Sequence, residues 1–427
     1  MSVDNKWSTY KLKIYQDRKG PQPLGTVVFE EVRAKAEEIL KDNPAWLYVH
    51  GSAGISATDK NNTRAFEKYA IIPRMLVDTT ARSLETTIFG KRHSAPLLIA
   101  PIGVQAILHP EAELAVARAA KNLGITYTLS TAASRSIEEV AEANGDGDRW
   151  YQLYWPKSDE VTLSLLKRAA QNGYSALVVT LDTVTIGWRP KDLENSYIPF
   201  IHGVGCQVGM SDPAFMAKYN YQPITGERPE FPYRPEKMDQ LIVQGDAKAK
   251  RDLFLGVEWL KETNSGHFRS WEHLQFLREN WKGPLVLKGI QCAQDAERAL
   301  ECGADGIVVS NHGGRQVDGA IPSLYALVNI MKSAKIREAQ RSGKLTVLFD
   351  SGVRTGTDII KALALGAQAV LLGRPWVYGL AAGGQAGVEQ VIEHTLADLD
   401  TNLGLAGYKT LADIQGKGEE VVVKLDF

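Results

Sequence analysis

The chain has 427 residues, enough for one large α/β barrel or for two domains. Its 49 Lys and Arg residues nearly balance its 50 Asp and Glu residues, and the net charge of -1 argues against nucleic acid or an anionic membrane as a partner. Cys206, Cys292 and Cys302 lack C-x-x-C spacing, so neither a disulfide framework nor a zinc site is expected.

The N-terminal sequence predicts neither secretion nor a membrane anchor. MSVDNKWSTYKLKIYQ has no apolar segment of the kind that a secretion signal requires, and no window of the chain approaches the length of a membrane span. We therefore expect a cytoplasmic protein without a metal ion, whose partners are small molecules or copies of itself.

The first predicted helix covers residues 26–41, where apolar side chains recur at helical spacing. Asn43 and Pro44 predict a turn that ends it. Tyr48 follows in the segment AWLYVHGSAG. A tyrosine in this position is more often a buried packing residue than a site residue, and composition alone leaves both interpretations open.

From Pro96 onward, apolar strand segments alternate with amphipathic helices. The helices include EAELAVARAAKNLG, SIEEVAEAN with Ser136 and Glu139 as a capping box, and AQDAERALECG with Gly303 at its C-terminal cap. Eight such strands predict a closed (β/α)8 TIM barrel of the α/β class. The strand candidates are Leu97–Gly103, Ile125–Thr131, Trp150–Trp155, Ala176–Asp182, Pro284–Ile290, Gly306–His312, Leu345–Gly352 and Ala369–Pro375.

Three parts are predicted along the chain. Residues 1–95 form an N-terminal helical extension that closes the barrel and contributes Tyr48, residues 96–400 form the barrel, and residues 401–427 form a C-terminal tail. Between the fourth and fifth strands, residues 190–283 are far longer than an ordinary connection. An insertion there serves as a lid or as an oligomer contact, and the apolar pattern does not distinguish the two.

The stretch GIVVSNHGGRQ, residues 306–316, is the clearest candidate for chemistry. Its apolar start reads as a strand buried on both faces, which would place His312 and Arg315 at the carboxyl end, where parallel folds bind ligands. Histidine suits proton transfer near neutral pH, and the planar fork of arginine matches a carboxylate or phosphate. By itself such a pair is more often an incidental feature of a capped loop, so the rest of the chain has to support it.

Polar residues also end the other predicted strands, as in the active sites of barrel enzymes. They are Gln105, Ser130, Gln152, Tyr154, Thr180, Asp182 and Lys288. The last two strands end in DSGVR (350–354) and GRP (373–375), whose glycines and arginines predict a phosphate site. The chain has no G-x-G-x-x-G and no P-loop sequence, which disfavours a Rossmann nicotinamide site.

SNHGGRQ, DSGVR and GRP, in this order and spacing, resemble the FMN-dependent α-hydroxy acid oxidase and dehydrogenase family from about Val27 to about Leu399. The resemblance implies FMN as cofactor, a small 2-hydroxy acid and O2 as substrates, and a homotetramer or homo-octamer. It also implies that His312 is the catalytic base and that Asp182 stabilises its imidazolium, with Tyr154 and Lys288 as further catalytic residues.

The same resemblance implies which residues contact the two ligands. The substrate contacts are Tyr48, Tyr154, Arg189, His312 and Arg315, with the arginines holding the carboxylate. The FMN contacts are Pro101, Ile102, Gly103, Ser130, Gln152, Thr180, Lys288, Ser310, Asp350, Ser351, Gly352, Arg354, Gly373 and Arg374. Lys288 would stabilise the negative charge that reduction places on the flavin ring.

Departures from the family pattern bear on the substrate and the products. Ala132 stands where glycolate oxidases have tryptophan, which disfavours glycolate. Gly103 in place of alanine and the long insertion resemble the lactate 2-monooxygenase branch, because a glycine would leave room beside the flavin and a lid would retain the product. The expected reaction is oxidation of L-lactate to acetate, CO2 and water. An oxidase that releases pyruvate and H2O2 and a catalytically silent flavin-binding barrel are the alternatives.

Overall fold

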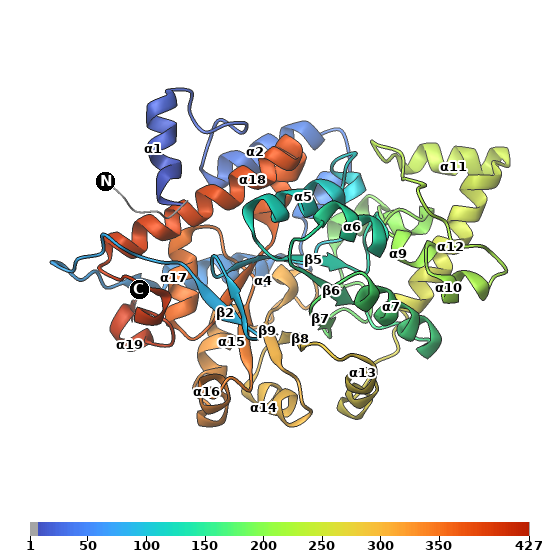
Figure 1. The fold of residues 1–427 in the computed structure, drawn as a ribbon. Helices are drawn as coiled ribbons and strands as arrows, with labels where there is room; N and C mark the ends of the chain where they lie inside the picture. Colours follow the sequence, from blue (N-terminus) through green and yellow to red (C-terminus); the bar gives the residue numbers. More distant parts are fainter. Residues whose placement is uncertain (1–6, 427) are drawn as a thin grey trace.

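The computed structural model describes residues 7–426. Residues 1–6 of the predicted N-terminal extension and residue 427 of the predicted C-terminal tail lie outside the described residues. Eight parallel strands form a closed barrel with helices around it (Figure 1), which confirms the predicted (β/α)8 fold. Seven of the predicted strand segments contain one of them, and the third, Trp150–Trp155, begins one residue after the start of its strand at Arg149. In order around the barrel they are β4 (Leu97–Ile99), β5 (Tyr127–Ser130), β6 (Arg149–Leu153), β7 (Leu177–Thr180), β8 (Leu285–Ile290), β9 (Gly306–Val309), β10 (Thr346–Phe349) and β11 (Ala369–Leu372).

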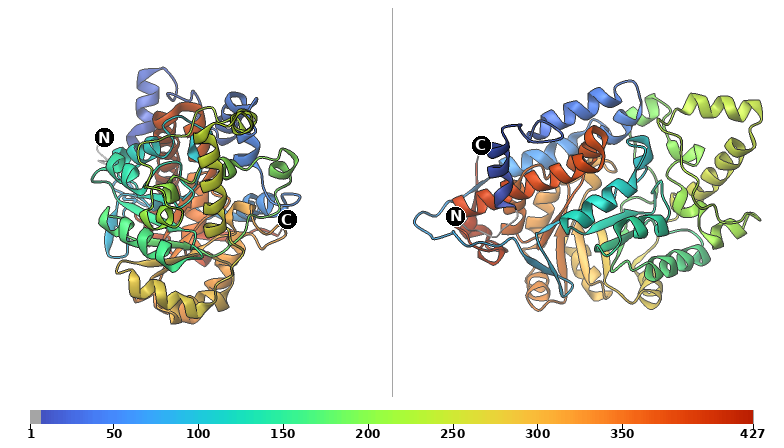
Figure 2. Two further views of the ribbon diagram at one scale, coloured as in Figure 1. Left: turned by 90° about the vertical axis from the view of Figure 1, so that its right-hand side faces the viewer. Right: turned by 45° about the horizontal axis from the view of Figure 1, so that its top comes forward.

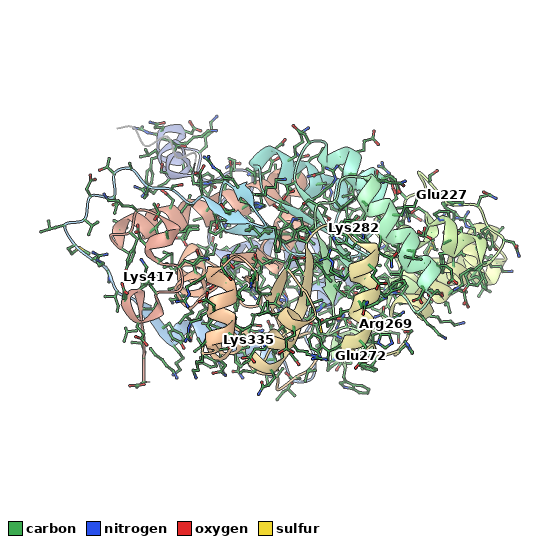
Figure 3. All side chains as sticks on the ribbon, turned by 60° about the horizontal axis from the view of Figure 1, so that its bottom comes forward. Glu227, Arg269, Glu272, Lys282, Lys335 and Lys417 are labelled. Carbon is green, nitrogen blue, oxygen red and sulfur yellow. The ribbon has the colours of Figure 1, made fainter. Side chains whose placement is uncertain are left out.

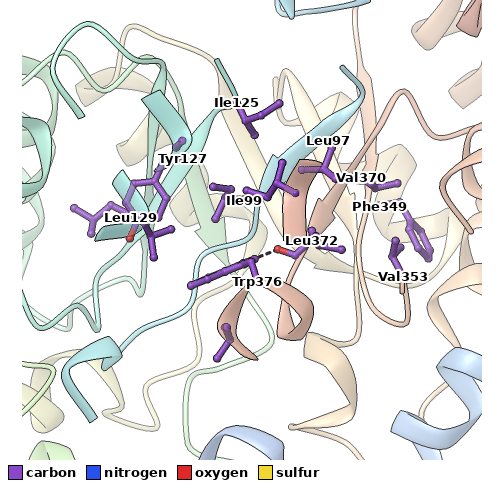
Figure 4. Packing of buried hydrophobic residues seen from close by; sticks show 14 of the residues in the cluster. Leu97, Ile99, Ile125, Tyr127, Leu129, Phe349, Val353, Val370, Leu372 and Trp376 are labelled. Atoms are coloured by element: carbon purple, nitrogen blue, oxygen red, sulfur yellow. Dashed lines mark hydrogen bonds between the residues drawn. The ribbon is translucent and has the colours of Figure 1, made fainter. Parts of the chain in front are cut away.

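The barrel strands are mostly apolar because both of their faces are covered, and their few polar residues include Ser130, Gln152 and Lys288. Alternate side chains such as Leu98 and Val308 fill the barrel interior, while their neighbours pack against the surrounding helices. Figure 4 shows part of this outer layer, where Trp376 lies beside Leu372 and its indole Nε1 donates a hydrogen bond to the Leu372 carbonyl oxygen at 2.8 Å. This packing holds the strand ends in fixed positions.

A hairpin lies against the barrel interior at the amino ends of the strands. Its strands are β2 (Thr86–Ile88) and β3 (Lys91–His93), and Ile88 is buried among the interior side chains. The Phe89 ring lies 5.5 Å from the Trp150 ring, and a Cβ on Gly306 would meet Phe89 at 2.9 Å. The hairpin therefore closes this end of the barrel, and the opposite, carboxyl end is the one available to a ligand.

The barrel helices match the predictions closely. The capping box is present at α6, where Ser136 and Glu139 bond reciprocally, and Gly303 follows α14 with a φ of 77°. The helices outside the insertion are α1 (Ser8–Asp17), α2 (Phe29–Leu40), α3 (Ala45–His50), α4 (Ala57–Glu67), α5 (Glu113–Leu123), α6 (Ile137–Asn144), α7 (Asp159–Gln171), α14 (Ala293–Glu301), α15 (Ser323–Ile330), α16 (Ala334–Arg341), α17 (Gly356–Ala364), α18 (Arg374–Leu405) and α19 (Gly418–Val421).

The predicted insertion is a folded, helical segment that extends the molecule beyond the barrel (Figures 1 and 2). Trp259 of its longest helix is buried against Phe215 with the rings 5.0 Å apart, so the insertion has an apolar core of its own. Its helices are α8 (Pro190–Glu194), α9 (Gln207–Met210), α10 (Pro213–Ala217), α11 (Pro235–Gln244), α12 (Ala247–Thr263) and α13 (Leu274–Asn280), with short 3-10 turns at Pro199–His202 and Trp271–His273.

The C-terminal segment is attached to the N-terminal one. The last barrel helix, α18, continues to Leu405, past the predicted boundary at residue 400, and β12 (Val422–Lys424) pairs antiparallel with β1 (Tyr69–Ile71). Charged side chains such as Lys335 and Lys417 lie on the outer surface (Figure 3). Within residues 7–426 no helix is both long and apolar enough to cross a membrane.

Candidate active site

A large cavity opens at the carboxyl ends of the barrel strands. Its empty volume is about 1320 Å³, a value that includes the open mouth. Tyr48 of α3 and Val377 of α18 line it together with the loops after the strands, and the insertion contributes Phe200, Trp259 and Asn264. The cavity wall therefore combines the barrel loops with the N-terminal segment, α18 and the insertion.

His312 and Asp182 form a hydrogen-bonded pair at this cavity. The His312 Nδ1 atom lies 2.9 Å from Asp182 Oδ1 and 3.1 Å from the Thr183 hydroxyl, although the two main residues are 130 positions apart. Burial would raise the pKa of Asp182, but the charges of His312 and Lys288 outweigh it and hold that pKa at about 2. The carboxylate is thus ionised and can stabilise a positive charge on the imidazole.

His312 itself is poised as a base. Burial lowers the pKa of His312 below its usual 6.5, and the partly opposing effect of Asp182 does not cancel this. The ring is therefore neutral at pH 7 and can accept a proton. Its backbone lies in the left-handed region with a φ of 58°, and Ser310 Oγ accepts the His312 backbone N–H at 3.0 Å, which fixes the loop that presents the ring.

Two arginines lie on the same side of the cavity. The Arg189 Nε atom donates to the Arg315 carbonyl oxygen at 3.0 Å, and its Nη2 atom donates to Gln316 Oε1 at 2.8 Å. Arg315 donates to the backbone carbonyls of Gly51 and Val49. Burial and the charge of Arg189 lower the pKa of Arg315 to about 9, so an anion bound between the two guanidinium groups would relieve their repulsion.

Two tyrosines complete this wall. Tyr48 lies beneath the Arg315 guanidinium, whose central carbon is 5.4 Å from the ring centroid. Burial raises the pKa of Tyr48, and it raises the pKa of Tyr154 to about 12. Both hydroxyls are therefore neutral at pH 7 and can donate a hydrogen bond to a bound carboxylate or hydroxyl group.

Lys288 lies deeper in the cavity. Its ammonium Nζ donates to the Ser310 hydroxyl at 3.1 Å and lies 3.4 Å from Asp350 Oδ2. Burial would lower the pKa of Lys288, but the carboxylates of Asp350 and Asp182 raise it overall, so the side chain stays charged. A fixed positive charge in a buried cavity is well placed to stabilise a negative charge that develops on a bound ligand.

The far end of the cavity is rich in positive charge. Arg374 pairs with Asp59 at 3.0 Å. The Arg354 guanidinium has no carboxylate within ion-pair distance among the described residues; it donates to the Val353 carbonyl at 2.9 Å and lies over the Phe29 ring. Burial and the charge of Arg374 lower the pKa of Arg354. Gly352, with a φ of 96°, and Gly373 also line this end. The combination matches a doubly charged phosphate group.

The chain matches known proteins over nearly its whole length. Residues 36–420 match the family model described as FMN-dependent dehydrogenase. The chain belongs to this family.

Among curated relatives of this FMN-dependent dehydrogenase, the FMN-dependent alpha-hydroxy acid dehydrogenase qulF of Penicillium citrinum is 46% identical, covering 95% of this chain and 94% of its own. An L-lactate oxidase of Lysinibacillus sphaericus is 38% identical, covering 92% and 94%. A crystal structure of mandelate oxidase is similar with a TM-score of 0.74 at 33% identity, covering 94% of this chain and all of that one. FMN is therefore the cofactor, and the protein is an oxidoreductase.

The residues of this FMN-dependent dehydrogenase fit the cofactor. Gln152 is buried and its Nε2 atom has no hydrogen-bond partner in the described structure, while its Oε1 atom accepts the Ser130 hydroxyl at 2.9 Å. An unpaired buried amide is costly unless a ligand accepts from it, and the polar edge of a flavin ring provides acceptors. Thr180 ends the next strand. Arg354 and Arg374 would hold the phosphate, and Lys288 would lie beside the ring.

The structure gives a packing reason for glycine at position 103. A Cβ at this position would lie 2.5 Å from the Ala132 carbonyl oxygen and 2.7 Å from the Ala132 Cβ. Glycine is therefore needed because the loops after β4 and β5 touch here, and Val104 N donates to that same carbonyl at 2.8 Å. This contact gives a packing reason for glycine, and the expectation that Gly103 also leaves room beside the flavin stays a prediction.

The structure brings the candidate residues together, since the lining of the cavity includes Tyr48, Pro101, Ile102, Gly103, Tyr154, Arg189, Lys288, His312, Arg315, Asp350, Ser351, Gly352, Arg354, Gly373 and Arg374. Sequence reasoning missed Thr183, Gln316 and Asp59, which contact His312, Arg189 and Arg374. Thr183 adjoins Asp182 and Gln316 belongs to the GGRQ stretch, so adjacency could have indicated these two. Asp59 carries no such signal.

Proposed function

We propose that this enzyme oxidises L-2-hydroxy acids, with L-lactate as the substrate and O2 as the acceptor. The observation that carries the proposal is the neutral His312, bonded to the ionised Asp182 and facing a cavity that Arg189 and Arg315 also line. A base beside a carboxylate clamp suits a molecule with a hydroxyl one carbon from its carboxylate. The relatives named for L-lactate and for alpha-hydroxy acids support the same substrate class.

The roles of the protein groups follow from their positions. Arg189 and Arg315 bind the substrate carboxylate, which fixes the carbon that carries the hydroxyl, and Tyr48 and Tyr154 donate hydrogen bonds to the substrate oxygens. The His312 ring takes up the hydroxyl proton at its Nε2 atom, since Nδ1 is held by Asp182, and Asp182 stabilises the imidazolium that results. The chemistry that bound FMN would supply is acceptance of the Cα hydrogen together with two electrons, and their later transfer to O2. Lys288 would stabilise the negative charge that reduction places on the flavin ring.

We propose further that the products in air are acetate, CO2 and water, as for a lactate 2-monooxygenase. The support for this is the insertion, which places Phe200, Trp259 and Asn264 in the cavity wall and so can retain pyruvate. Retained pyruvate reacts with hydrogen peroxide formed in the same cavity, and the carbon–carbon bond to the carboxylate breaks. One pyruvate and one H2O2 give one acetate, one CO2 and one water, which balances atoms and electrons.

The product test separates three outcomes. Purified holoenzyme is supplied with L-lactate in air, and acetate, pyruvate and H2O2 are measured against oxygen consumed. Acetate equal to oxygen consumed, with little free H2O2, supports the monooxygenase. Pyruvate and H2O2 in equal amounts contradict it and leave an oxidase. Absence of both oxygen uptake and anaerobic flavin reduction with L-lactate and with larger L-2-hydroxy acids, from a protein that binds FMN, would support the silent barrel instead.

Self-association into a homotetramer or homo-octamer is also part of the proposal, and it rests on the resemblance in sequence. Sedimentation velocity of the holoenzyme tests it directly, because a chain of 46.9 kDa that sediments as a monomer at micromolar concentration would contradict it.

A further inference from the structure

Two loops beside the cavity are tied to each other. The loop after β4 contains Pro101, Ile102 and Gly103, and the loop after β5 contains Ala132; all four line the cavity. Val104 N donates to the Ala132 carbonyl at 2.8 Å, which joins the loops at the cavity wall. The relative position of the loops therefore decides the shape of this side of the proposed FMN site.

Glu113 links the same loops from below. It is the first residue of α5, its side chain is completely buried, and it does not itself line the cavity. Its Oε1 atom accepts the backbone N–H of Gln105 at 3.2 Å and the backbone N–H of Ser134 at 2.8 Å. One carboxylate oxygen thus satisfies a donor from each loop.

Gln105 extends this link to the cavity wall. Its Nε2 atom donates to the Ile102 carbonyl at 2.9 Å and to the Tyr127 hydroxyl at 3.1 Å. A shift of Gln105 would therefore move Ile102 as well. Glu113 holds the Gln105 backbone, so its influence reaches the cavity through a chain of two hydrogen bonds.

The burial of Glu113 is costly for a residue with only a structural role. Its Oε2 atom has no hydrogen-bond partner in the described structure, and residues 7–426 show no ion pair to it. Arg135 is in electrostatic contact with Glu113, but burial still raises the pKa of the Glu113 carboxyl, and the terminal nitrogens of Arg135 donate to the carbonyls of Ser134 and Pro110. A buried carboxylate without an ion pair costs free energy, which its loop contacts must offset.

We propose that Glu113 is a positioning residue for FMN, which holds the loops after β4 and β5 in register so that Ile102, Gly103 and Ala132 form one wall of the cofactor site. The proposal rests on the placement of FMN against these loops. Glu113 acts through these loops and not through a contact of its own with the cofactor or substrate.

The test compares two variants that differ in the acceptor at this position. Glu113→Ala leaves the N–H groups of Gln105 and Ser134 without an acceptor, and Glu113→Gln keeps an acceptor of the same shape without the charge. We expect Glu113→Ala to weaken FMN binding by about tenfold or more and Glu113→Gln to restore it to within about threefold of wild type, since an unmet buried donor is worth about that much. FMN affinity is read from the quenching of its fluorescence by apoprotein.

Amide hydrogen exchange of the apoprotein gives a second readout that does not depend on FMN. In Glu113→Ala, exchange should accelerate in residues 101–106 and 131–135, while residues 115–123 of α5 keep their protection. The matched control is Glu139→Ala, which removes the carboxylate that accepts the Ser136 N–H at 3.0 Å at the next helix but bonds neither loop donor of Glu113. It should lower thermal stability without changing FMN affinity.

Three results would overturn the proposal. The first is wild-type FMN affinity in Glu113→Ala. The second is a Glu113→Gln variant as defective as Glu113→Ala, which would mean that the charge at the start of α5 matters rather than the acceptor. The third is faster amide exchange of both loops in Glu113→Ala together with unchanged FMN affinity. That combination would mean that FMN binds away from these loops, and it would leave the proposed oxidation of 2-hydroxy acids untouched. If Glu113→Ala does not fold, Glu113→Asp replaces it, because the shorter side chain keeps the charge and cannot reach both donors; FMN affinity at the wild-type level in that variant would equally overturn the proposal.

Discussion

The pairing of Asp182 with His312 allows one substitution to be worked through quantitatively. In the wild type, Asp182 Oδ1 lies 2.9 Å from His312 Nδ1. Asp182→Asn keeps the size of the side chain and an oxygen that can face the same nitrogen, but it removes the negative charge. Two unit charges about 4 Å apart at an effective dielectric constant of about 20 interact by roughly 4 kcal/mol. Because His312 becomes positive only as it takes the substrate proton, most of this energy is lost from the transition state.

We therefore expect Asp182→Asn to slow flavin reduction by roughly 10²- to 10³-fold, since each 1.36 kcal/mol is a factor of about ten. Stopped-flow absorbance under anaerobic conditions measures this rate at saturating L-lactate. Thr183→Val is the matched control, because its hydroxyl lies 3.1 Å from the same Nδ1 atom but carries no charge. Loss of that neutral contact should cost about 1 kcal/mol, or roughly fivefold. Equal effects of the two variants would refute the assignment of Asp182 as the electrostatic partner of His312.

Further predictions concern the base, the clamp, the phosphate end and the pH dependence. His312→Gln should retain FMN and slow flavin reduction by several orders of magnitude, and a reduction rate near wild type would refute its role as base. Arg315→Lys keeps the charge but loses the fork, so KM for L-lactate should rise at least about tenfold at unchanged FMN content, whereas unchanged KM would count against the clamp. Arg354→Met should raise the Kd for FMN at least about tenfold while KM for L-lactate in excess FMN stays the same, and equal FMN affinity would place the phosphate elsewhere. Because the pKa of His312 is lowered from 6.5 and the base must be neutral, kcat/KM should be constant from about pH 7 up to the pKa of Arg315, about 9, and should fall on the acid side as the pH drops through the lowered pKa of His312. In Asp182→Asn the acid-side fall should move to still lower pH, since the carboxylate raises the pKa of His312.

Much of the fold could be predicted because local patterns and global packing agree. GIVV and TVLF are buried at every position and almost wholly apolar since barrel strands are buried on both faces, and their lengths and the intervening helices allow a count of eight. The capping box at Ser136 is likewise a local signal with a local cause. The hairpin that places Phe89 beside Trp150 had no such signal, because a contact between residues 61 positions apart depends on how the whole barrel closes.

The site was predictable to the extent that its residues end strands. His312, Lys288 and Asp182 follow apolar runs, and the closed barrel alone brings their ends together. The partners that fix these residues come from other parts of the chain. Asp59 beside Arg374 belongs to α4, and Glu113 beneath the cavity reads in sequence as an ordinary acidic residue at a helix start. Only the folded arrangement distinguishes such residues from the many surface carboxylates.

The insertion shows the same limit. Its length predicted a lid or an oligomer contact, and no pattern within residues 190–283 separated the two. In the structure Phe200 and Trp259 line the cavity, so at least part of the insertion forms the wall of the site. Helix α11, none of whose residues is buried, lies away from the barrel (Figure 1), and it remains available for contacts between copies of the chain.

Anaerobic mixing of the FMN-loaded protein with L-lactate tests the central claim most directly. If the cavity oxidises a 2-hydroxy acid at His312, the yellow absorbance of the oxidised flavin should bleach and one pyruvate should form per flavin, whereas His312→Gln with bound FMN should stay yellow on the same time scale. A wild-type flavin that remains oxidised with L-lactate and with larger L-2-hydroxy acids would contradict the account.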